Sequence, residues 1–479
     1  MKPQTQLICY VDRLSGGGLA QLGELLDGPL AGLFGGVHLL PFFDPIDGAD
    51  AGFDPIDHTK VDPRLGTWSD LAALSQRCEV MADLIVNHIS GQSPQFLDFI
   101  QRGDASAWSG LILKPSAVFP GGATQAELDL IYRPRPGRPF SEVTLADGES
   151  RTVWTTFTPN QIDIDVESAQ GQAYLRSILD RFQRSGVRSI RLDAAGYAIK
   201  RRGTSCFMLP ETFSFIRELA GAARTRGMEV LVEIHAHYET QLGIAEQVDW
   251  VYDFALPPLI LHAFCYGSAV PLRHWIRKRP SNSITVLDTH DGIGIVDIGS
   301  SGGLPGLVPP EELDRLVDYI HECSGGQSRL ATGASASNLD LYQVNCTYFD
   351  ACARDAEAYL AARAIQLFLP GVPQIYYVGL LGGTNDLDLL ARTGVGRDIN
   401  RHHYSQEEVL QALRNPMVSR LFELIRLRNE HPALQGAFTV REAPSHMLCL
   451  QWSSERHKLE LDVDLRLRRF EVRATAPSA

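Results

Sequence analysis

The chain has 479 residues, of which 44% are hydrophobic and 21% are charged, and its formal net charge is −13. These proportions are those of a globular protein and exclude disordered and collagen-like chains. The negative charge disfavours binding to nucleic acid. At roughly 150 residues per domain, the length predicts about three units, or one large domain with insertions.

The cysteines give no sign of a metal site or a disulfide framework. Eight of them are spread along the chain without a CxxC pair, which is typical of buried free thiols in a reducing compartment. The N-terminal residues lack a signal-peptide pattern, and nowhere do 18 apolar residues follow one another. We therefore expect a cytoplasmic protein that does not enter a membrane.

Short apolar runs recur along the chain, with helix-like segments between them. Each run is rich in Val, Ile, Leu or aromatic residues and lacks polar alternation, as in a strand covered by helices on both faces. The runs lie at 6–12, 36–43, 79–88, 187–196, 228–235, 248–256, 283–292 and 373–379. Amphipathic segments at 171–186 and 210–227 predict two of the intervening helices, and Gly186 is a suitable residue to end the first.

Eight strands alternating with helices predict an α/β fold, a (β/α)8 TIM barrel, with a doubly wound open sheet as the alternative. The placement of polar residues favours the barrel. Asn87–His88, Asp193, Glu233–His235 and Asp288–His290–Asp291 all stand at the carboxyl ends of apolar runs. In a barrel these ends converge on one face, so residues far apart in sequence meet in one pocket.

Two stretches interrupt the alternation and predict insertions that wall an active site. The first has many turn formers and little helical periodicity, and the second is rich in Gly and Ser with one helix predicted at 309–322. Near the C-terminus, alternation of apolar and polar residues predicts a small antiparallel β domain. The expected division is barrel segments at 1–88, 168–293 and 356–433, an inserted subdomain at 89–167, an inserted loop subdomain at 294–355, and the β domain at 434–479.

Three carboxylates at strand ends could carry chemistry. Asp193 stands two residues after Arg191 on the same face of its strand, so we expect the guanidinium to keep it ionised, as a nucleophile requires. Glu233 ends an apolar run beside His235, where burial can raise the pKa of a carboxyl to suit a general acid. Asp291 could bind substrate hydroxyls that change geometry in the transition state. Taken singly, each residue could instead make a structural ion pair or a packing contact.

Other chemistries fit the sequence less well. His88, His235 and His290 could bind a metal together with a carboxylate, but they stand at three different strand ends. No GxSxG elbow joins a strand to a helix, and the P-loop and dinucleotide-binding fingerprints are missing. Three carboxylates with neighbouring histidines fit glycosyl transfer through an oxocarbenium-like transition state. Retention then requires a nucleophile and an acid/base about 5 Å apart, which adjacent strands can provide.

Several segments match a known family. In order, DLIVNH at 83–88, IRLDAAG at 190–196, VLVEIH at 230–235 and VLDTHD at 286–291 resemble the four signature regions of the α-amylase superfamily. Within that superfamily the sequence is similar to the sucrose phosphorylase group at 40–68, 132–137, 203–208, 252–263, 337–348, 369–379 and 396–402. The resemblance covers nearly the whole chain to about residue 435.

The resemblance implies an enzyme that phosphorolyses sucrose, with retention, to α-D-glucose 1-phosphate and fructose through a β-glucosyl-enzyme, with no cofactor. Asp193 would be the nucleophile, Glu233 the acid/base and Asp291 the transition-state stabiliser. On the glucosyl side the implied residues are His88, Arg191 and His290, with Asp50 and Arg397 at the far hydroxyl and Phe53 and Phe157 as an apolar wall. On the acceptor side, where fructose and phosphate alternate, they are Arg135, Tyr197, His235, Leu341, Tyr342 and Gln343. Tyr132 and Trp154 are interpreted as packing residues.

Phosphate binding needs local positive charge, because the net charge of −13 does not attract an anion. A guanidinium binds a tetrahedral dianion in bidentate fashion, and Arg135 in the first insertion could supply it.

Asn87 occupies the position of a calcium ligand in many α-amylases. No further set of oxygen ligands is evident in the sequence, so we predict no metal requirement.

Related activities remain open at this point. The donor could be sucrose 6′-phosphate, glucosylglycerol or glucosylglycerate, or the same carboxylates could serve a hydrolase or transglucosidase. A non-catalytic sugar-binding relative would have lost a catalytic carboxylate, and none is lost. Members of the group commonly pair, so we expect a homodimer.

Overall fold

The computed structural model describes residues 1–48, 50–133, 137–332 and 343–475. Its centre is a closed barrel of parallel strands in the order β1-β16-β13-β12-β11-β10-β5-β2. The strands are β1 Gln6–Cys9, β2 Gly36–Leu39, β5 Glu79–Ile85, β10 Ser189–Asp193, β11 Glu229–Val232, β12 Trp250–Asp253, β13 Ser283–Thr285 and β16 Val372–Tyr376. Each overlaps one of the predicted apolar runs, so the predicted TIM barrel is confirmed and the open sheet is excluded.

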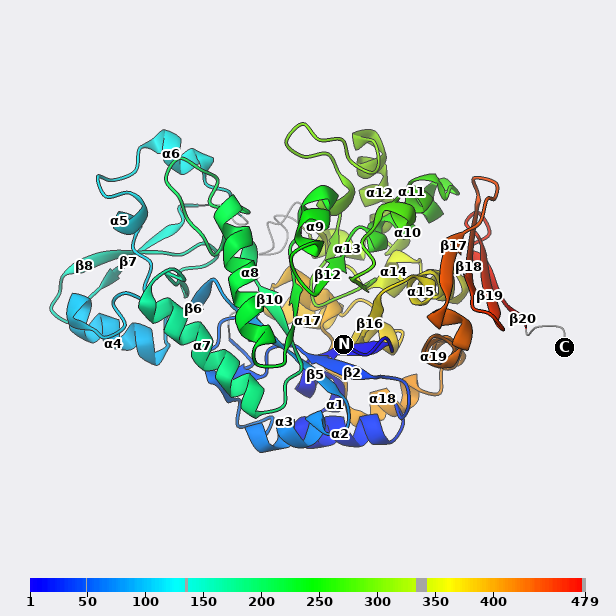
Figure 1. The fold of residues 1–479 in the computed structure, drawn as a ribbon, viewed down its shortest axis with the longest axis horizontal. Helices are drawn as coiled ribbons and strands as arrows, with labels where there is room; N and C mark the ends of the chain where they lie inside the picture. Colours follow the sequence, from blue (N-terminus) through cyan, green and yellow to red (C-terminus); the bar gives the residue numbers. More distant parts are fainter. Residues whose placement is uncertain (49, 134–136, 333–342, 476–479) are drawn as a thin grey trace.

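Helices surround the barrel and cover its outer face (Figure 1). They include α2 Leu19–Asp27, α3 Trp68–Ser75, α7 Ala169–Arg184, α8 Pro210–Arg224, α9 Tyr238–Ala245, α10 Leu256–Tyr266, α11 Val270–Lys278, α15 Ala356–Phe368, α17 Leu387–Thr393, α18 Gln406–Ala412 and α19 Pro416–Glu430. The two predicted amphipathic helices form α7 and α8. Helix α7 ends as expected, with Gly186 at φ +80° just beyond its C-cap, a conformation that favours glycine.

The first insertion lies between β5 and α7 and forms one end of the molecule in Figure 1. Its elements are β6 His88–Ser90, α4 Pro94–Arg102, α5 Pro115–Val118, α6 Gln125–Leu130, β7 Phe140–Thr144, β8 Ser150–Trp154 and β9 Gln161–Asp163. The helices contradict the expectation of little helical structure. Helix α4 forms because Ser93 caps it, Pro94 fits its first turn, and Phe96 and Phe99 are buried, a signal too short to stand out as periodicity.

The second insertion lies between β13 and α15. The described elements are β14 Ile293–Gly294, the 3-10 turn η3 Val296–Ile298, α12 Pro310–Cys323, α13 Gln327–Leu330, β15 Gln343–Val344 and α14 Tyr348–Ala351. Helix α12 is the one predicted at 309–322. Strands β14 and β15 pair with Gly294 opposite Gln343, which fixes Gln343 at the barrel mouth.

The C-terminal residues form the predicted antiparallel sheet, at the end of the molecule opposite the first insertion (Figure 1). Its strands are β17 Ala437–Val440, β18 Met447–Ser453, β19 Lys458–Asp464 and β20 Arg469–Thr475, in that order. The sheet is tied to the barrel by Trp452, whose indole Nε1 donates to the Phe368 carbonyl at the end of α15 at 2.6 Å. The domain boundaries given above remain predictions.

Two further expectations concern the whole chain. All eight cysteines are free thiols; five are buried and Cys78, Cys265 and Cys323 are half-buried. Within the described ranges, no helix is both long enough and apolar enough to cross a membrane.

Candidate active site

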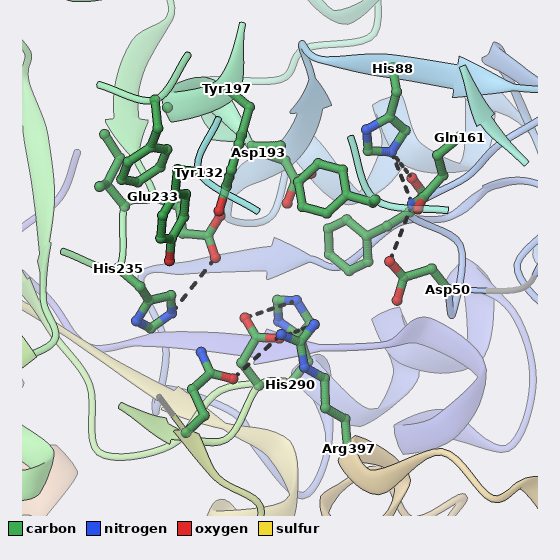
Figure 2. Close-up of a pocket in the computed structure, with 18 of the residues that line it drawn as sticks. Asp50, His88, Tyr132, Gln161, Asp193, Tyr197, Glu233, His235, His290 and Arg397 are labelled. Carbon is green, nitrogen blue, oxygen red and sulfur yellow. Dashed lines mark hydrogen bonds and ion pairs between the residues drawn. The ribbon is translucent and has the colours of Figure 1, made fainter. Parts of the chain in front are cut away.

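The polar residues at the strand ends come together in one pocket (Figure 2). Asp193 is the last residue of β10, Glu233 directly follows β11, and Asp291 follows β13. The pocket has a volume of about 980 Å³, part of it open to solvent. Its lining consists of Asp50, Phe53, His88, Tyr132, Phe157, Gln161, Asp193, Ala194, Gly196, Tyr197, Phe207, Glu233, Ile234, His235, His290, Asp291, Val296, Gln343 and Arg397.

Arg191 lies beneath the pocket and binds two of its carboxylates. Its Nη1 donates to Asp193 Oδ1 at 3.1 Å, and its Nη2 is 2.9 Å from Glu233 Oε1. The buried Asp83 accepts a hydrogen bond from the same Nη1 at 2.6 Å and so fixes the position of the guanidinium. Because adjacent nitrogens of one planar group bind both carboxylates, Asp193 and Glu233 are held side by side, as a retaining pair must be.

Asp193 does not behave as the sequence suggested. Burial raises its pKa well above the ordinary value, Arg191 opposes the shift, and Glu233 adds to it. The guanidinium therefore acts in the expected direction, but burial outweighs it. Arg191 favours the ionised form of Asp193, which is the form that a nucleophile needs.

Asp291 stays ionised beside this pair. Burial alone would raise its pKa, but Arg397, whose Nη1 lies 2.9 Å from Asp291 Oδ1, and the other positive groups nearby together outweigh burial and lower it. His290 stacks on Phe53 with ring centroids 4.7 Å apart, and burial lowers the pKa of this imidazole well below its ordinary value. His290 is therefore a neutral hydrogen-bonding group at neutral pH.

One end of the pocket is built by a polar cluster. Gln161 Nε2 lies 3.3 Å from Asp50 Oδ2 and 3.2 Å from His88 Nε2, which is in turn 2.9 Å from the Phe53 carbonyl. In Figure 2 these side chains face the end of the pocket away from His235. Gln161 comes from β9, which pairs with β6, so the first insertion completes this end.

The opposite end carries aromatic rings and His235. The ring of Phe207 lies 4.5 Å from Tyr132 and 4.8 Å from Tyr197, measured between centroids. Tyr132 packs as predicted, against these rings, and it also lines the pocket, which was not predicted. Its backbone N–H donates to the Ser205 carbonyl at 2.8 Å, which folds the first insertion back over the barrel. Trp154 does pack, within an apolar cluster of the insertion.

The predicted site residues that the structure describes surround this pocket, with one difference. Arg191 is 2% exposed and is absent from the pocket lining, so it contacts the carboxylates rather than the cavity. Arg135, Leu341 and Tyr342 lie outside the described residues. Gln161 and Val296 were not predicted as site residues, because nothing in their local sequence distinguishes them. Phe207 lies in the matched segment 203–208 but was not singled out there.

The turn after the candidate nucleophile is strained. Ala194 has φ +54°, a left-handed conformation that is uncommon for a residue other than glycine. The turn leads into the short 3-10 helix Ala195–Tyr197, which brings Tyr197 back to the pocket wall. Strain of this kind is often found at functional sites.

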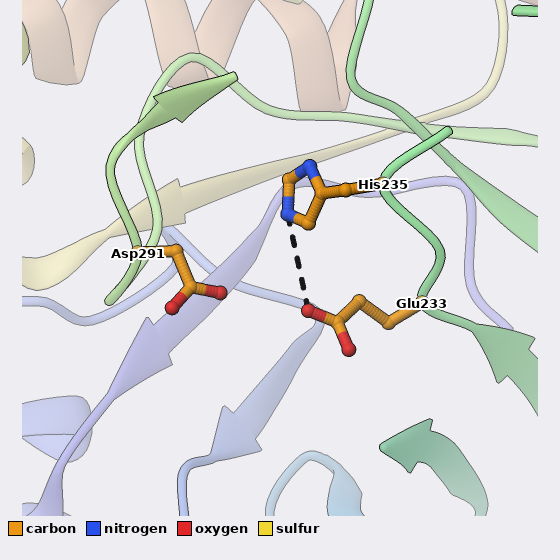
Figure 3. Close-up of side chains that lie close together, drawn as sticks. All are labelled: Glu233, His235 and Asp291. Carbon is orange, nitrogen blue, oxygen red and sulfur yellow. Dashed lines mark ion pairs between the residues drawn. The ribbon is translucent and has the colours of Figure 1, made fainter. Parts of the chain in front are cut away.

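Two groups of side chains were considered as possible metal sites. Glu233, His235 and Asp291 bring potential ligand atoms within 4.8 Å of one another (Figure 3). Burial lowers the pKa of His235, but Asp297, 3.1 Å away, acts with Glu233 and Asp291 to raise it to about 9, so the ring is protonated at neutral pH and a metal would have to displace that proton to bind. At the second place, Asn87 Oδ1 accepts from Lys200 Nζ at 2.7 Å, and the same ammonium contacts Asp163 and the Tyr197 carbonyl, both at 2.5 Å. An ammonium therefore takes the place that a bound cation would need.

The comparisons with known proteins agree with this geometry. Residues 32–241 match the family model described as alpha amylase, catalytic domain. A sucrose phosphorylase from Agrobacterium vitis is 61% identical over 95% of this chain and 93% of its own length. The chain belongs to the sucrose phosphorylase group of the α-amylase superfamily. Another member, a sucrose phosphorylase from Bifidobacterium adolescentis, is 51% identical over 96% of this chain and 92% of its own.

A solved structure of the same group has the same fold. The sucrose 6F-phosphate phosphorylase from Thermoanaerobacter thermosaccharolyticum superposes with a TM-score of 0.90 at 35% identity, covering 99% of this chain and 96% of that one. A glucosylglycerol phosphorylase from Marinobacter adhaerens is 39% identical over 99% of this chain and 97% of its own length.

Proposed function

We propose that this chain catalyses phosphorolysis of sucrose to α-D-glucose 1-phosphate and fructose, by double displacement with retention. The observation that carries the proposal is the joint binding of Asp193 and Glu233 by Arg191, beside an ionised Asp291. The 61% identity to a sucrose phosphorylase over nearly its full length supports sucrose as the donor.

In the first displacement, Asp193 attacks the anomeric carbon of the glucosyl unit, and the bond to the fructosyl oxygen breaks. Glu233 gives its proton to that oxygen, so fructose leaves as a neutral sugar and a β-glucosyl ester forms on Asp193. The ionised Asp291 stabilises the positive charge that develops on the ring. Asp50, His88, Gln161, His290 and Arg397 are placed to bind the glucosyl hydroxyls, with Phe53 and Phe157 as apolar walls.

In the second displacement, phosphate takes the place of fructose. Glu233, now ionised, accepts a proton from the phosphate as its oxygen attacks the anomeric carbon, and the ester to Asp193 breaks. The product is α-D-glucose 1-phosphate, and Glu233 is protonated again. Tyr197 and His235 stand at the end of the pocket where this exchange would occur, and Gln343 also lines the pocket. Arg135, Leu341 and Tyr342 are proposed to join them.

A panel of glucosides with and without phosphate tests the proposal. We expect glucose 1-phosphate and fructose in equal amounts from sucrose, at a rate that depends on phosphate. Sucrose 6′-phosphate, glucosylglycerol and glucosylglycerate should be poorer donors. Release of glucose at a rate that phosphate does not change would instead indicate a hydrolase, and preference for another donor would indicate one of the related phosphorylases.

Two assignments from the sequence remain predictions. We propose a homodimer, for which light scattering should give about twice the 52.8 kDa of one chain, and a cytoplasmic location. A monomeric mass would reject the dimer.

A further inference from the structure

His235 is held in one orientation by a residue from the second insertion. Its Nδ1 lies 3.1 Å from Asp297 Oδ2, which leaves Nε2 directed into the pocket, 3.9 Å from Glu233 Oε1 (Figure 3). Phe254, just beyond β12, stacks on the imidazole with centroids 4.0 Å apart and planes 15° apart. One nitrogen and the plane of the ring are thus fixed, so the direction of the other nitrogen is fixed too.

Asp297 is placed for this contact. The residue is fully buried in η3, and Gln241 Nε2 from α9 donates to its Oδ1 at 2.8 Å. A Cβ atom on Gly294 would come within 2.2 Å of Asp297 Oδ2, so the glycine in β14 leaves the room that the carboxylate occupies. A buried carboxylate is strongly disfavoured without a cationic partner, and His235 is the partner that touches its second oxygen.

The charges around His235 make it a cation within an otherwise acidic pocket. The ionisable groups that face the ring are Asp297 from η3, Glu233 after β11 and Asp291 after β13, and all three favour the protonated form. Among the described lining residues, Arg397 is the other cation, and it is paired with Asp291. A phosphate dianion that enters near Asp297, Glu233 and Asp291 is repelled by their charges. It therefore needs a positive group at the end of the pocket where it binds.

We propose that Asp297 is a positioning residue that holds His235 as a cation, with Nε2–H aimed at the phosphate that replaces fructose. The proposal rests on the proposed function, since it assigns the charge on which the phosphate step depends. Asp297 itself does not touch the substrate; it acts through His235. Charge-assisted hydrogen bonds to an anion are roughly twice as strong as neutral ones, so loss of the charge weakens phosphate binding.

The test is the pH dependence of the phosphate KM in Asp297→Asn, which keeps the size and an acceptor oxygen but removes the charge. A His235 pKa of about 9 keeps the ring mostly protonated at pH 8. An ordinary imidazole, with a pKa of about 6.5, is protonated to only about 3% at that pH. We expect the phosphate KM of the variant to rise by roughly tenfold or more between pH 6 and pH 8, and that of the wild type to change far less.

Two controls separate a positioning role from a structural one. Asp314→Asn removes an exposed carboxylate from α12 of the same insertion and should leave the phosphate KM as in the wild type. Hydrolysis of α-glucosyl fluoride without phosphate reports glucosyl-enzyme formation and turnover by water, and Asp297→Asn should change it less than the phosphate KM. If the variant does not fold, the wild type alone is decisive, because its phosphate KM should rise as pH passes through about 9.

The outcomes are distinct. Parallel pH dependence of the phosphate KM in the variant and the wild type overturns the role of Asp297 and leaves the proposed function standing. A wild-type phosphate KM that does not change up to pH 10 also overturns the role of Asp297 and leaves the proposed function standing. If the wild type forms no glucose 1-phosphate from sucrose at any pH, the proposed function is wrong and this inference is lost with it.

Discussion

Replacement of Lys200 by Met should loosen the first insertion from the barrel. The Lys200 ammonium is buried and contacts oxygens of Asn87, Asp163 and Tyr197 at 2.5–2.7 Å. These three residues belong to the end of β5, to β9 and to the turn after β10. A single charge therefore joins the insertion to two strands of the barrel, and methionine keeps most of the side-chain volume while removing that charge.

The expected loss of stability follows from the contacts that the Asp163 carboxylate keeps after the substitution. This carboxylate is fully buried, and after the substitution its remaining described contacts are the N–H and hydroxyl of Thr156, at 2.8 and 2.6 Å. Removing one partner of a buried ion pair costs about 3–5 kcal/mol. At about 2.1 cal/mol/K of unfolding entropy per residue, a chain of this length that unfolds as one unit should lose about 3–5 °C in Tm.

Differential scanning calorimetry measures the Tm, and limited proteolysis at 89–167 measures opening of the insertion. Arg201→Met is the matched control, because the neighbouring Arg201 makes a bidentate ion pair with Glu167 at the surface, at 2.6 and 2.7 Å. We expect that exposed pair to contribute less than about 1 kcal/mol. Equal Tm values for the two variants, with no faster cleavage of the insertion in Lys200→Met, would refute the reasoning.

The remaining predictions concern catalysis. Asp193→Asn should lower the rate of phosphorolysis by about 10⁴-fold or more, and near-native turnover in a steady-state assay would show that the nucleophile lies elsewhere. Glu233→Gln should be severely impaired with sucrose but partly restored with a donor whose leaving group needs no proton; equal loss with both donors would argue against the acid role. Arg135→Ala should raise the phosphate KM about ten- to a hundredfold and increase the ratio of glucose to glucose 1-phosphate, and an unchanged ratio and KM would remove Arg135 from the phosphate site.

Much of the fold and the centre of the pocket could be predicted from the sequence. Apolar runs without alternation mark strands buried on both faces, and the runs correspond to the eight barrel strands. The polar residues Asp193, Glu233 and Asp291 stand at the ends of such runs. Barrel geometry brings those ends to one face, so their meeting in one pocket follows from strand order alone.

The tertiary structure decided what local sequence does not encode. Gln161, Tyr132 and Asp297 are distant in sequence from the barrel strand ends; no periodicity or motif marks Gln161 and Asp297, and the matched segment at 132–137 does not by itself place Tyr132 in the pocket. Their positions depend on how the insertions pair, as β9 does with β6 and β14 with β15. The direction of the pKa shift of Asp193 could not be predicted from the sequence, because a pKa depends on burial and on neighbours from several elements at once. Spacing along one strand predicts that Arg191 contacts Asp193; only the packed barrel shows that Glu233 shares the same guanidinium and that burial prevails.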